Sequence, residues 1–290
     1  MIQVEKYHGT GNDFVIVDAD ADVPDRRAFA RRICDRETGI DHPASPRVGA
    51  DGVLFLALEA GSRFTPPRAV MTLVQPDGSV AAMCGNGARC AAEWAARRLR
   101  DRPEGFDGEV MIDTQSGTRR ATVGETVTIE MGQPTFAPDE VPVEAAEPVI
   151  EREVAGLTIT AVNTGVPHAV ALVEDVDAID LATVAPPVRH ADVFPRGANV
   201  TLAARDGDGY RQRTFERGVE GETDSCGTGA VAVGAVAHRL GHVETGETVH
   251  VSPPGGTLDV TVTERGSTLC GPVAHEFSAE VAAGPLPADD

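Results

Sequence analysis

Two short stretches of the chain, CGNGA at residues 84–88 and CGTGA at residues 226–230, share the pattern Cys-Gly-x-Gly-Ala. Each leads into an alanine-rich run that is typical of a helix, CAAEWAARRLR after the first and VAVGAVAHRLG after the second. The second run has almost no polar side chain before His238, so a helix over 228–240 must be enclosed on nearly every face. The pattern predicts two equivalent helices, each beginning beside a cysteine.

The repeat extends beyond these helices. After each comes a pair of strands joined by a glycine turn, EVMIDTQSGTRRATV (109–123) and TVHVSPPGGTLDVTV (248–262), and then a third strand. Two further blocks precede each helix and match in the same order, GTGNDFVIVD with NTGVPHAVALV and VGADGVLFL with RGANVTLAA. Four matched blocks in one order predict a duplicated α/β unit.

The expected fold is α/β (α+β), with two pseudo-symmetric domains, each a central helix wrapped by a curved mixed β-sheet. We expect domains at 1–130 and 131–272, with the tail 273–290 returning to the first and the Pro- and Glu-rich segment 134–153 as the linker. Residues 25–36 are predicted as a helix with Ala28, Phe29 and Ile33 facing inward. β-Branched content and alternation predict strands at 2–7, 13–18, 68–75, 126–131, 157–163, 168–174, 198–204 and 210–216.

The composition is that of a folded protein with a strongly acidic surface. Hydrophobic residues make up 41%, and 25 basic against 45 acidic residues give a net charge of −20. This charge argues against nucleic acid and anionic membranes as partners. With no long apolar run and no signal-peptide pattern, we expect a soluble, cytoplasmic protein. Lys6 is the only lysine, which favours a halophile-like protein adapted to high salt; the alternative is a GC-rich genome that encodes arginine instead.

The five cysteines indicate free thiols. Their odd number argues against a disulfide framework, and the lack of CxxC spacing argues against structural zinc, so no metal site is expected. Cys84 and Cys226 each precede the start of a helix, where unpaired N–H groups and the helix dipole stabilise a thiolate. A single such cysteine is more simply explained as a small buried residue. Two at equivalent points of a repeat indicate an acid–base pair that inverts a stereocentre, one removing and the other returning a proton.

The motifs KYHGTGNDFVIVD, CGNGARC, VPHAV, ERGVEGET and SCGTGA together resemble those of the diaminopimelate epimerase family, in order and along essentially the whole chain. The resemblance implies two pseudo-symmetric domains with the active site in the interdomain cleft. It also implies that LL- and meso-2,6-diaminopimelate are interconverted in lysine biosynthesis by a two-base mechanism without cofactor. The expected partner is thus a small amino acid; a homodimer is left open.

The resemblance assigns roles by position. Cys84 and Cys226 match the catalytic thiols, and His168 and Glu216 match groups that tune or deprotonate them. Arg217 is suited to hold a carboxylate. The expected substrate-binding residues are Asn12, Gln75, Gly85, Asn86, Asn199, Glu216, Arg217, Gly227 and Thr228.

The chain departs from the family pattern at three positions. Gln75 stands where bacterial members often have asparagine, while Gly52 and Val166 replace residues with amide side chains. Neither Gly52 nor Val166 can supply a side-chain hydrogen bond, so recognition of the distal end of the substrate is the part most affected. Cys34, Cys90 and Cys270 receive no role, and Cys90 is expected in the core.

Other interpretations remain open at this point. Asn12 would also suit a turn, Glu216 and Arg217 a surface ion pair, and His168 a packed loop. The nearest rival function is a proline or hydroxyproline racemase or epimerase of the same architecture. Less favoured are a two-thiol redox protein and a non-catalytic small-molecule binding module.

Overall fold

The chain folds as two units of similar topology. The computed structural model describes residues 1–62, 65–100 and 105–284. Its contacts divide the chain into a first unit, Met1–Ile129 with the C-terminal segment that begins at Pro272, and a second unit, Glu130–Gly271. Among the described residues, no helix is both long enough and apolar enough to cross a membrane.

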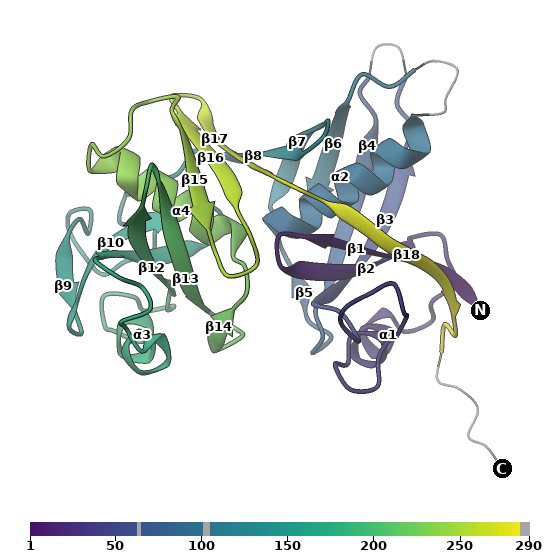
Figure 1. Cartoon of the computed structure of the whole chain (residues 1–290), viewed down its shortest axis with the longest axis horizontal. Helices are drawn as coiled ribbons and strands as arrows, with labels where there is room; N and C mark the ends of the chain where they lie inside the picture. The colour runs from purple at the N-terminus through teal and green to yellow at the C-terminus, as the bar shows by residue number, and fades with distance from the viewer. Residues whose placement is uncertain (63–64, 101–104, 285–290) are drawn as a thin grey trace. The chain divides into compact units, whose positions relative to one another are not determined.

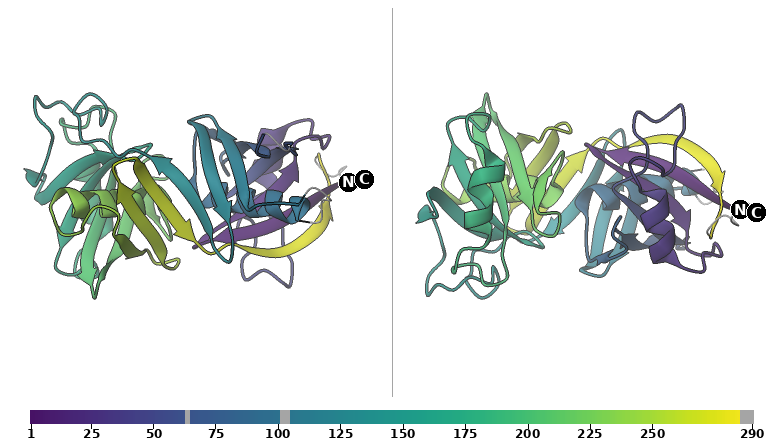
Figure 2. Two further views of the ribbon diagram at one scale, coloured as in Figure 1. Left: turned by 90° about the horizontal axis from the view of Figure 1, so that it is seen from above. Right: turned by 90° about the horizontal axis from the view of Figure 1, so that it is seen from below.

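The first unit is a mixed sheet that includes the C-terminal strand. β18 pairs antiparallel with β1, β1 with β2, β3 with β4, β6 with β7 and β7 with β8, whereas β2–β3 and β4–β6 are parallel; β5 adds to β4. The C-terminal strand runs beside the N-terminal one in both views of Figure 2. The strands are β1 (Ile2–Gly9), β2 (Asn12–Asp18), β3 (Gly52–Glu59), β4 (Arg68–Val74), β5 (Val80–Ala81), β6 (Glu109–Thr114), β7 (Gly117–Val123), β8 (Val127–Gly132) and β18 (Ala274–Val281).

The second unit repeats this order of pairings. β10–β11, β12–β13, β15–β16 and β16–β17 are antiparallel, β11–β12 and β13–β15 are parallel, and the short β9 and β14 add to β10 and β13. The repeat in the sequence is therefore a repeat of topology. The strands are β9 (Arg152–Val154), β10 (Leu157–Asn163), β11 (Pro167–Val173), β12 (Asn199–Asp206), β13 (Gly209–Glu216), β14 (Gly221–Thr223), β15 (Thr248–Ser252), β16 (Leu258–Thr263) and β17 (Gly266–Gly271).

Each sheet curves around one long helix, as predicted. α2 (Gly85–Leu99) packs against β1–β4, β6 and β7, and α4 (Gly227–Arg239) packs against β10–β13 and β15–β17 (Figure 1). All of α4 from Gly229 to Ala237 is buried, which confirms that this apolar helix is enclosed. The sheet approaches so closely that a Cβ at Gly234 would lie 2.6 Å from Val260 Cγ1.

The first short helix ends earlier than predicted. α1 spans Arg26–Ile33, and the Asp25 side chain caps it by accepting from the Arg27 and Ala28 N–H groups. The Asp35 side chain then accepts from the N–H groups of Glu37 and Thr38, so the chain leaves the helix instead of continuing to residue 36.

The inward face of this helix also differs from the prediction. Phe29 and Ile33 are buried as expected, but Ala28 is exposed and Ala30 takes its place. Ala30 follows Phe29 on the face that turns toward the sheet, whereas Ala28 lies on the opposite side of Phe29.

Two segments of the second unit differ from the sequence analysis. The segment 134–153 is part of the second unit and not a linker into it, because Val141 and Val149 are buried in the core of this unit. The helix α3 (Leu181–Arg189), which packs against β12 and β13, was not anticipated; Pro186 and Pro187 within it mask its helical character.

Candidate active site

Cys84 occupies the N-cap position of α2 in the first unit. Its backbone is extended, as an N-cap requires, and Sγ accepts the Gly87 N–H at 3.4 Å. A thiolate at this position is stabilised by the backbone donor and by the positive end of the helix dipole.

A chain of amides lies beside this helix start. Asn86 Nδ2 donates to Asn12 Oδ1 at 2.7 Å, and Arg89 Nη1 donates to Asn86 Oδ1 at 2.8 Å. Arg89, which is fully buried, also donates to the hydroxyl of Thr10 at 2.8 Å. Thr10 has φ of +52°, so this bond supports a β-branched residue in the left-handed region at the β1–β2 turn.

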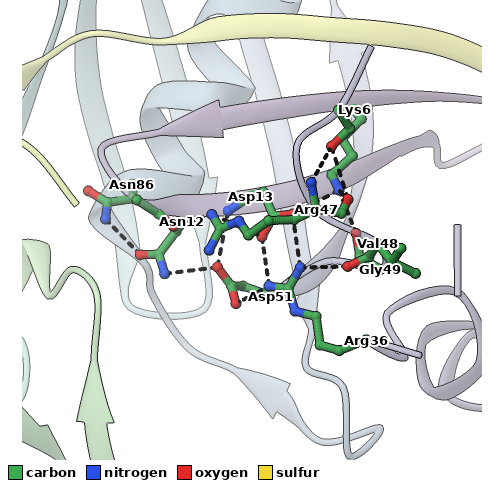
Figure 3. A network of polar contacts seen from close by, with 11 residues as sticks. Lys6, Asn12, Asp13, Arg36, Arg47, Val48, Gly49, Asp51 and Asn86 are labelled. Carbon is green, nitrogen blue, oxygen red and sulfur yellow. Dashed lines mark hydrogen bonds and ion pairs between the residues drawn. The ribbon is translucent and has the colours of Figure 1, made fainter. Parts of the chain in front are cut away.

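An ionic network holds Asn12 from its other side (Figure 3). Asn12 Nδ2 donates to Asp51 at 3.1 Å, and Arg36 bridges Asp51 and Asp13 at 2.5 and 2.7 Å. Lys6, the only lysine, is fully buried and lies 2.8 Å from Asp13. It also donates to two backbone carbonyls, those of residues 47 and 49. The first unit therefore fixes the Asn12 amide through charged groups.

The two carboxyl groups of this network differ in acidity. Burial alone raises the pKa of Asp13, but the hydrogen bonds from Arg36 and Lys6 outweigh it and lower this pKa to about 2. Burial and the neighbouring Asp13 charge raise the pKa of Asp51. Asp13 is thus the permanent anion that balances the buried ammonium.

Cys226 occupies the equivalent N-cap position of α4 but has a different neighbour. It is buried, and its Sγ lies 3.4 Å from Thr228 Oγ1. The Thr228 hydroxyl in turn lies 3.0 Å from His168 Nε2. The imidazole therefore reaches the thiol through a hydroxyl group.

His168 is fully buried on β11. Its Nδ1 lies 3.1 Å from Thr201 Oγ1, and its Nε2 also lies 3.3 Å from Asn199 Nδ2. Burial, aided by the positive charge of Arg217, lowers the pKa of His168 to about 3. The ring is consequently neutral at physiological pH and acts through hydrogen bonds.

Asn199 and the pair Glu216–Arg217 come together at the carboxyl end of β13. Asn199 Oδ1 accepts the Arg217 backbone N–H at 2.7 Å, and Glu216 accepts the Thr223 hydroxyl at 2.5 Å. The partly buried Arg217 guanidinium donates to the carbonyls of Arg196 and Gly197 at 3.3 and 3.4 Å. Burial, with Arg189 nearby, lowers the pKa of Arg217, but a guanidinium remains charged and can bind a carboxylate.

The three departures from the family pattern lie at turns and strand ends. Gln75 Oε1 accepts the Ser79 hydroxyl at 2.9 Å within its own turn. A Cβ at Gly52 would lie 2.7 Å from Leu73 Cδ1, so the backbone there is closely packed. Val166 is half-buried in the β10–β11 connection.

All five cysteines are free. Cys90 lies in the core, as expected, and burial raises its pKa; burial likewise raises the pKa of Cys34 to about 12. Both therefore remain protonated thiols. Within the described ranges, no cluster of three or more His, Cys, Asp or Glu side chains is arranged to hold a metal ion.

Three residues that contact the expected site were missed by the sequence analysis. Asp51 and Arg89 hold the two asparagine amides of the first unit, and Thr201 holds the imidazole of the second. Arg89 had a usable signal, since it follows Asn86 by three positions on the predicted helix and so lies on the same face. Thr201 had none, because a β-branched residue is ordinary within a strand.

Comparison with known proteins gives one consistent family. Residues 4–137 and 160–276 match the model of the family described as diaminopimelate epimerase. A protein of that name from Methanocella arvoryzae is 40% identical, covering 97% of this chain and 96% of the relative.

Two solved structures show the same fold at low sequence identity. A phenazine biosynthesis protein of the PhzF family from Bacillus anthracis has a TM-score of 0.66 at 18% identity, covering 97% of this chain and 99% of that one. A probable proline racemase from Agrobacterium radiobacter has a TM-score of 0.64 at 19% identity, covering 99% and 95%. These similarities show only the fold, which a proline racemase has as well.

Proposed function

Because this chain belongs to the diaminopimelate epimerase family, an isomerase family of lysine biosynthesis, we propose that Cys84 and Cys226 are the acid–base pair that epimerises diaminopimelate. The observation that supports this is the placement of both thiols at the N-caps of the two repeated helices. Cysteine at a helix N-terminus is a competent base because its thiolate is stabilised there. One thiolate removes the α-proton of the LL isomer, and the other thiol returns a proton to the opposite face to give the meso isomer.

The helix starts also suit the charge of the substrate. The α-carboxylate gains negative charge as the α-proton leaves, and the N–H groups of Gly85–Asn86 and Gly227–Thr228 are donors at positive helix ends. Asn12 and Asn86 offer amide hydrogens already oriented by Asp51 and Arg89. We assign these groups to binding the reacting amino-acid end.

The other polar groups of the second unit suit the remaining charges of diaminopimelate. Arg217 is the cation for the second carboxylate, and Glu216 with Asn199 supplies acceptors for an ammonium group. Gln75, held in its own turn, is the weakest of the proposed contacts. A cytoplasmic location stays a prediction of the sequence, and a homodimer stays open.

The decisive experiment is epimerisation of LL-diaminopimelate by the purified protein in heavy water without added cofactor, at low and at high salt. We expect the meso isomer with deuterium at one α-carbon. L-Proline and hydroxyproline serve as control substrates and should gain no deuterium. Exchange into proline instead of diaminopimelate, or no exchange at any salt concentration, would overturn the proposal.

A further inference from the structure

A column of buried polar side chains lies under the start of α4. Gln212 Nε2 donates to Thr214 Oγ1 at 2.9 Å, Thr214 Oγ1 lies 3.2 Å from Thr201 Oγ1, and Thr201 Oγ1 lies 3.1 Å from His168 Nδ1. None of the four side chains is more than 2% exposed. Gln212 Oε1 has no hydrogen-bond partner among the described residues, but the other polar atoms of the column are paired, so the directions of their hydrogen bonds can be deduced from donor and acceptor chemistry.

At the Gln212 end of the column, the direction of the hydrogen bonds is fixed. The Gln212 amide also lies 3.3 Å from the carbonyl oxygen of Cys226. A carbonyl only accepts, so the group that faces it is the amide NH₂, which also donates to Thr214. The Gln212 amide is therefore locked in one of its two orientations.

The outer end is fixed independently. Asn199 Oδ1 accepts the Arg217 backbone N–H, so Asn199 turns its NH₂ group toward His168 Nε2. A ring nitrogen that faces a donor must itself accept, and the ring is neutral, so its hydrogen is on Nδ1. Nδ1–H then donates to Thr201, whose hydroxyl donates onward to Thr214. Thr214 Oγ1 then accepts from both the Thr201 hydroxyl and the Gln212 amide, which its two lone pairs allow.

This tautomer determines what Thr228 presents to Cys226. His168 Nε2 is an acceptor, so the Thr228 hydroxyl donates to it across 3.0 Å. The lone pairs of Thr228 Oγ1 then remain for Cys226 Sγ at 3.4 Å, an arrangement that favours S–H as the donor. The Thr228 hydroxyl could stabilise a thiolate at Cys226 only by turning toward the sulfur.

We propose that Thr201, backed by Thr214, is a positioning residue that keeps His168 in its Nδ1–H form and thereby holds Cys226 as the neutral thiol of the resting enzyme. Cys84, whose sulfur accepts a backbone N–H, is then the thiolate of the pair. The inference rests on the proposed function only in treating these two cysteines as the acid–base pair. The tautomer itself is independent of it.

The first test reads the tautomer directly in the unmodified protein. Long-range ¹H–¹⁵N spectra of histidine-labelled protein, with a His168→Gln sample for assignment, should show His168 protonated at Nδ1 and not at Nε2 at neutral pH. A proton on Nε2 overturns the proposal. This result does not depend on any catalytic activity, so failure of the proposed function would be seen separately.

The second test changes the column and reads the reactivity of Cys226. In Thr201→Val the buried Nδ1–H loses its acceptor, which costs more than giving up the long 3.3 Å contact with Asn199. The ring should therefore move its hydrogen to Nε2, and the Thr228 hydroxyl becomes free to donate to a thiolate. One hydrogen bond to an anion should raise the rate of iodoacetamide alkylation at Cys226 about tenfold at neutral pH. Rates are mapped by mass spectrometry, each compared with the same cysteine in the unmodified protein.

Two controls accompany this test. Thr201→Ser keeps the hydroxyl group and should leave the Cys226 rate unchanged, and Cys84, in the other unit, should react alike in all samples. Circular dichroism confirms that each variant is folded. An unchanged Cys226 rate in folded Thr201→Val, or an equal rise in Thr201→Ser, overturns the proposal; if Thr201→Val does not fold, the tautomer measurement decides.

Discussion

The two units present the same backbone under their cysteine helices but line it with opposite chemistry. Phe14 and His168 occupy matching places, since Phe14 pairs with Gly52 across parallel strands and His168 pairs with Asn199 in the same way. Continuing along the registers, the second unit places Thr201, Thr214 and Gln212 where the first places Leu54, Leu73 and Met71.

The neighbours of the helix glycines show this difference. A Cβ at Gly87 would meet Leu54 and Phe14, whereas a Cβ at the matching Gly229 would meet Gln212 at 2.6 Å. The first unit holds its polar groups elsewhere, in the ionic network around Asp13. A duplicated scaffold therefore sets two thiols at equivalent helix ends while leaving each with its own acid–base surroundings.

The largest expected effect tests whether both thiols are required despite these surroundings. Cys84→Ser and Cys226→Ser should each lower kcat for epimerisation by several orders of magnitude, because a hydroxyl is far too weak an acid to replace the thiol. The double variant should lose little more, since the two act as a unit. Cys90→Ser is the control and should keep kcat nearly intact; a near-normal rate for Cys226→Ser would break the equivalence of the two units.

The next largest effect is on stability, and it should differ between the ionic network of the first unit and the neutral column of the second. Lys6→Met leaves Asp13 buried without its ammonium partner and should lower the free energy of unfolding by about 3–5 kcal/mol. Gln212→Met, which removes only neutral hydrogen bonds, should cost about 1–3 kcal/mol. Denaturant titration measures both, and equal losses would contradict the distinction.

A third variant gives the second unit the side chain of the first. His168→Phe removes the partner of both Thr201 and Thr228 and should lower kcat about 100-fold, in the range for a group that assists proton transfer. Phe14→Leu, the control at the matching position, should affect stability more than kcat. Turnover within a few-fold of normal in a folded His168→Phe variant would show that the imidazole has no part in the chemistry.

The smallest effect is the acid sensitivity of the first unit. The pKa of Asp13 is lowered to about 2 in the folded protein, so its contribution to stability is complete above the unfolded value near pH 4. It is lost as the pH falls toward 2, and the shift corresponds to about 2 kcal/mol. Unfolding free energies measured between pH 5 and 2 should fall less in Asp13→Asn than in the unmodified protein; parallel curves would exclude Asp13 as the cause.

How much the sequence predicts depends on whether a signal is local. The strands and cysteine helices follow from periodicity and from Gly-x-Gly at a helix start, both of which are local. The predicted end of α1 was wrong because the Asp35 side chain caps the next turn. The prediction for Ala28 was wrong because Ala28 and Ala30 flank Phe29, and the sequence does not show which of the two faces inward.

The site was predictable to the same extent. Cys84, Cys226 and the motif asparagines stand out in the sequence, but the groups behind them do not. The contacts of Thr201 and Gln212 follow only from the cross-strand registers, and the role of Asp51 follows only from its hydrogen bond to Asn12. Likewise, the sequence of segment 134–153 does not show that its valines are buried, because they lie in a polar stretch; the structure places them in the core of the second unit.

Because Lys6 is buried, its chemical modification can report when the first unit opens. Lys6 is the only lysine, and the other side chains with a permanent positive charge are arginines. Because Lys6 is buried, the folded surface has no side-chain ammonium group that an amine-directed reagent can reach. Such a reagent modifies Lys6 only when β1 separates from the Asp13 network. Acylation of this one residue, followed by mass, would therefore time the opening of the first unit with no background from the second.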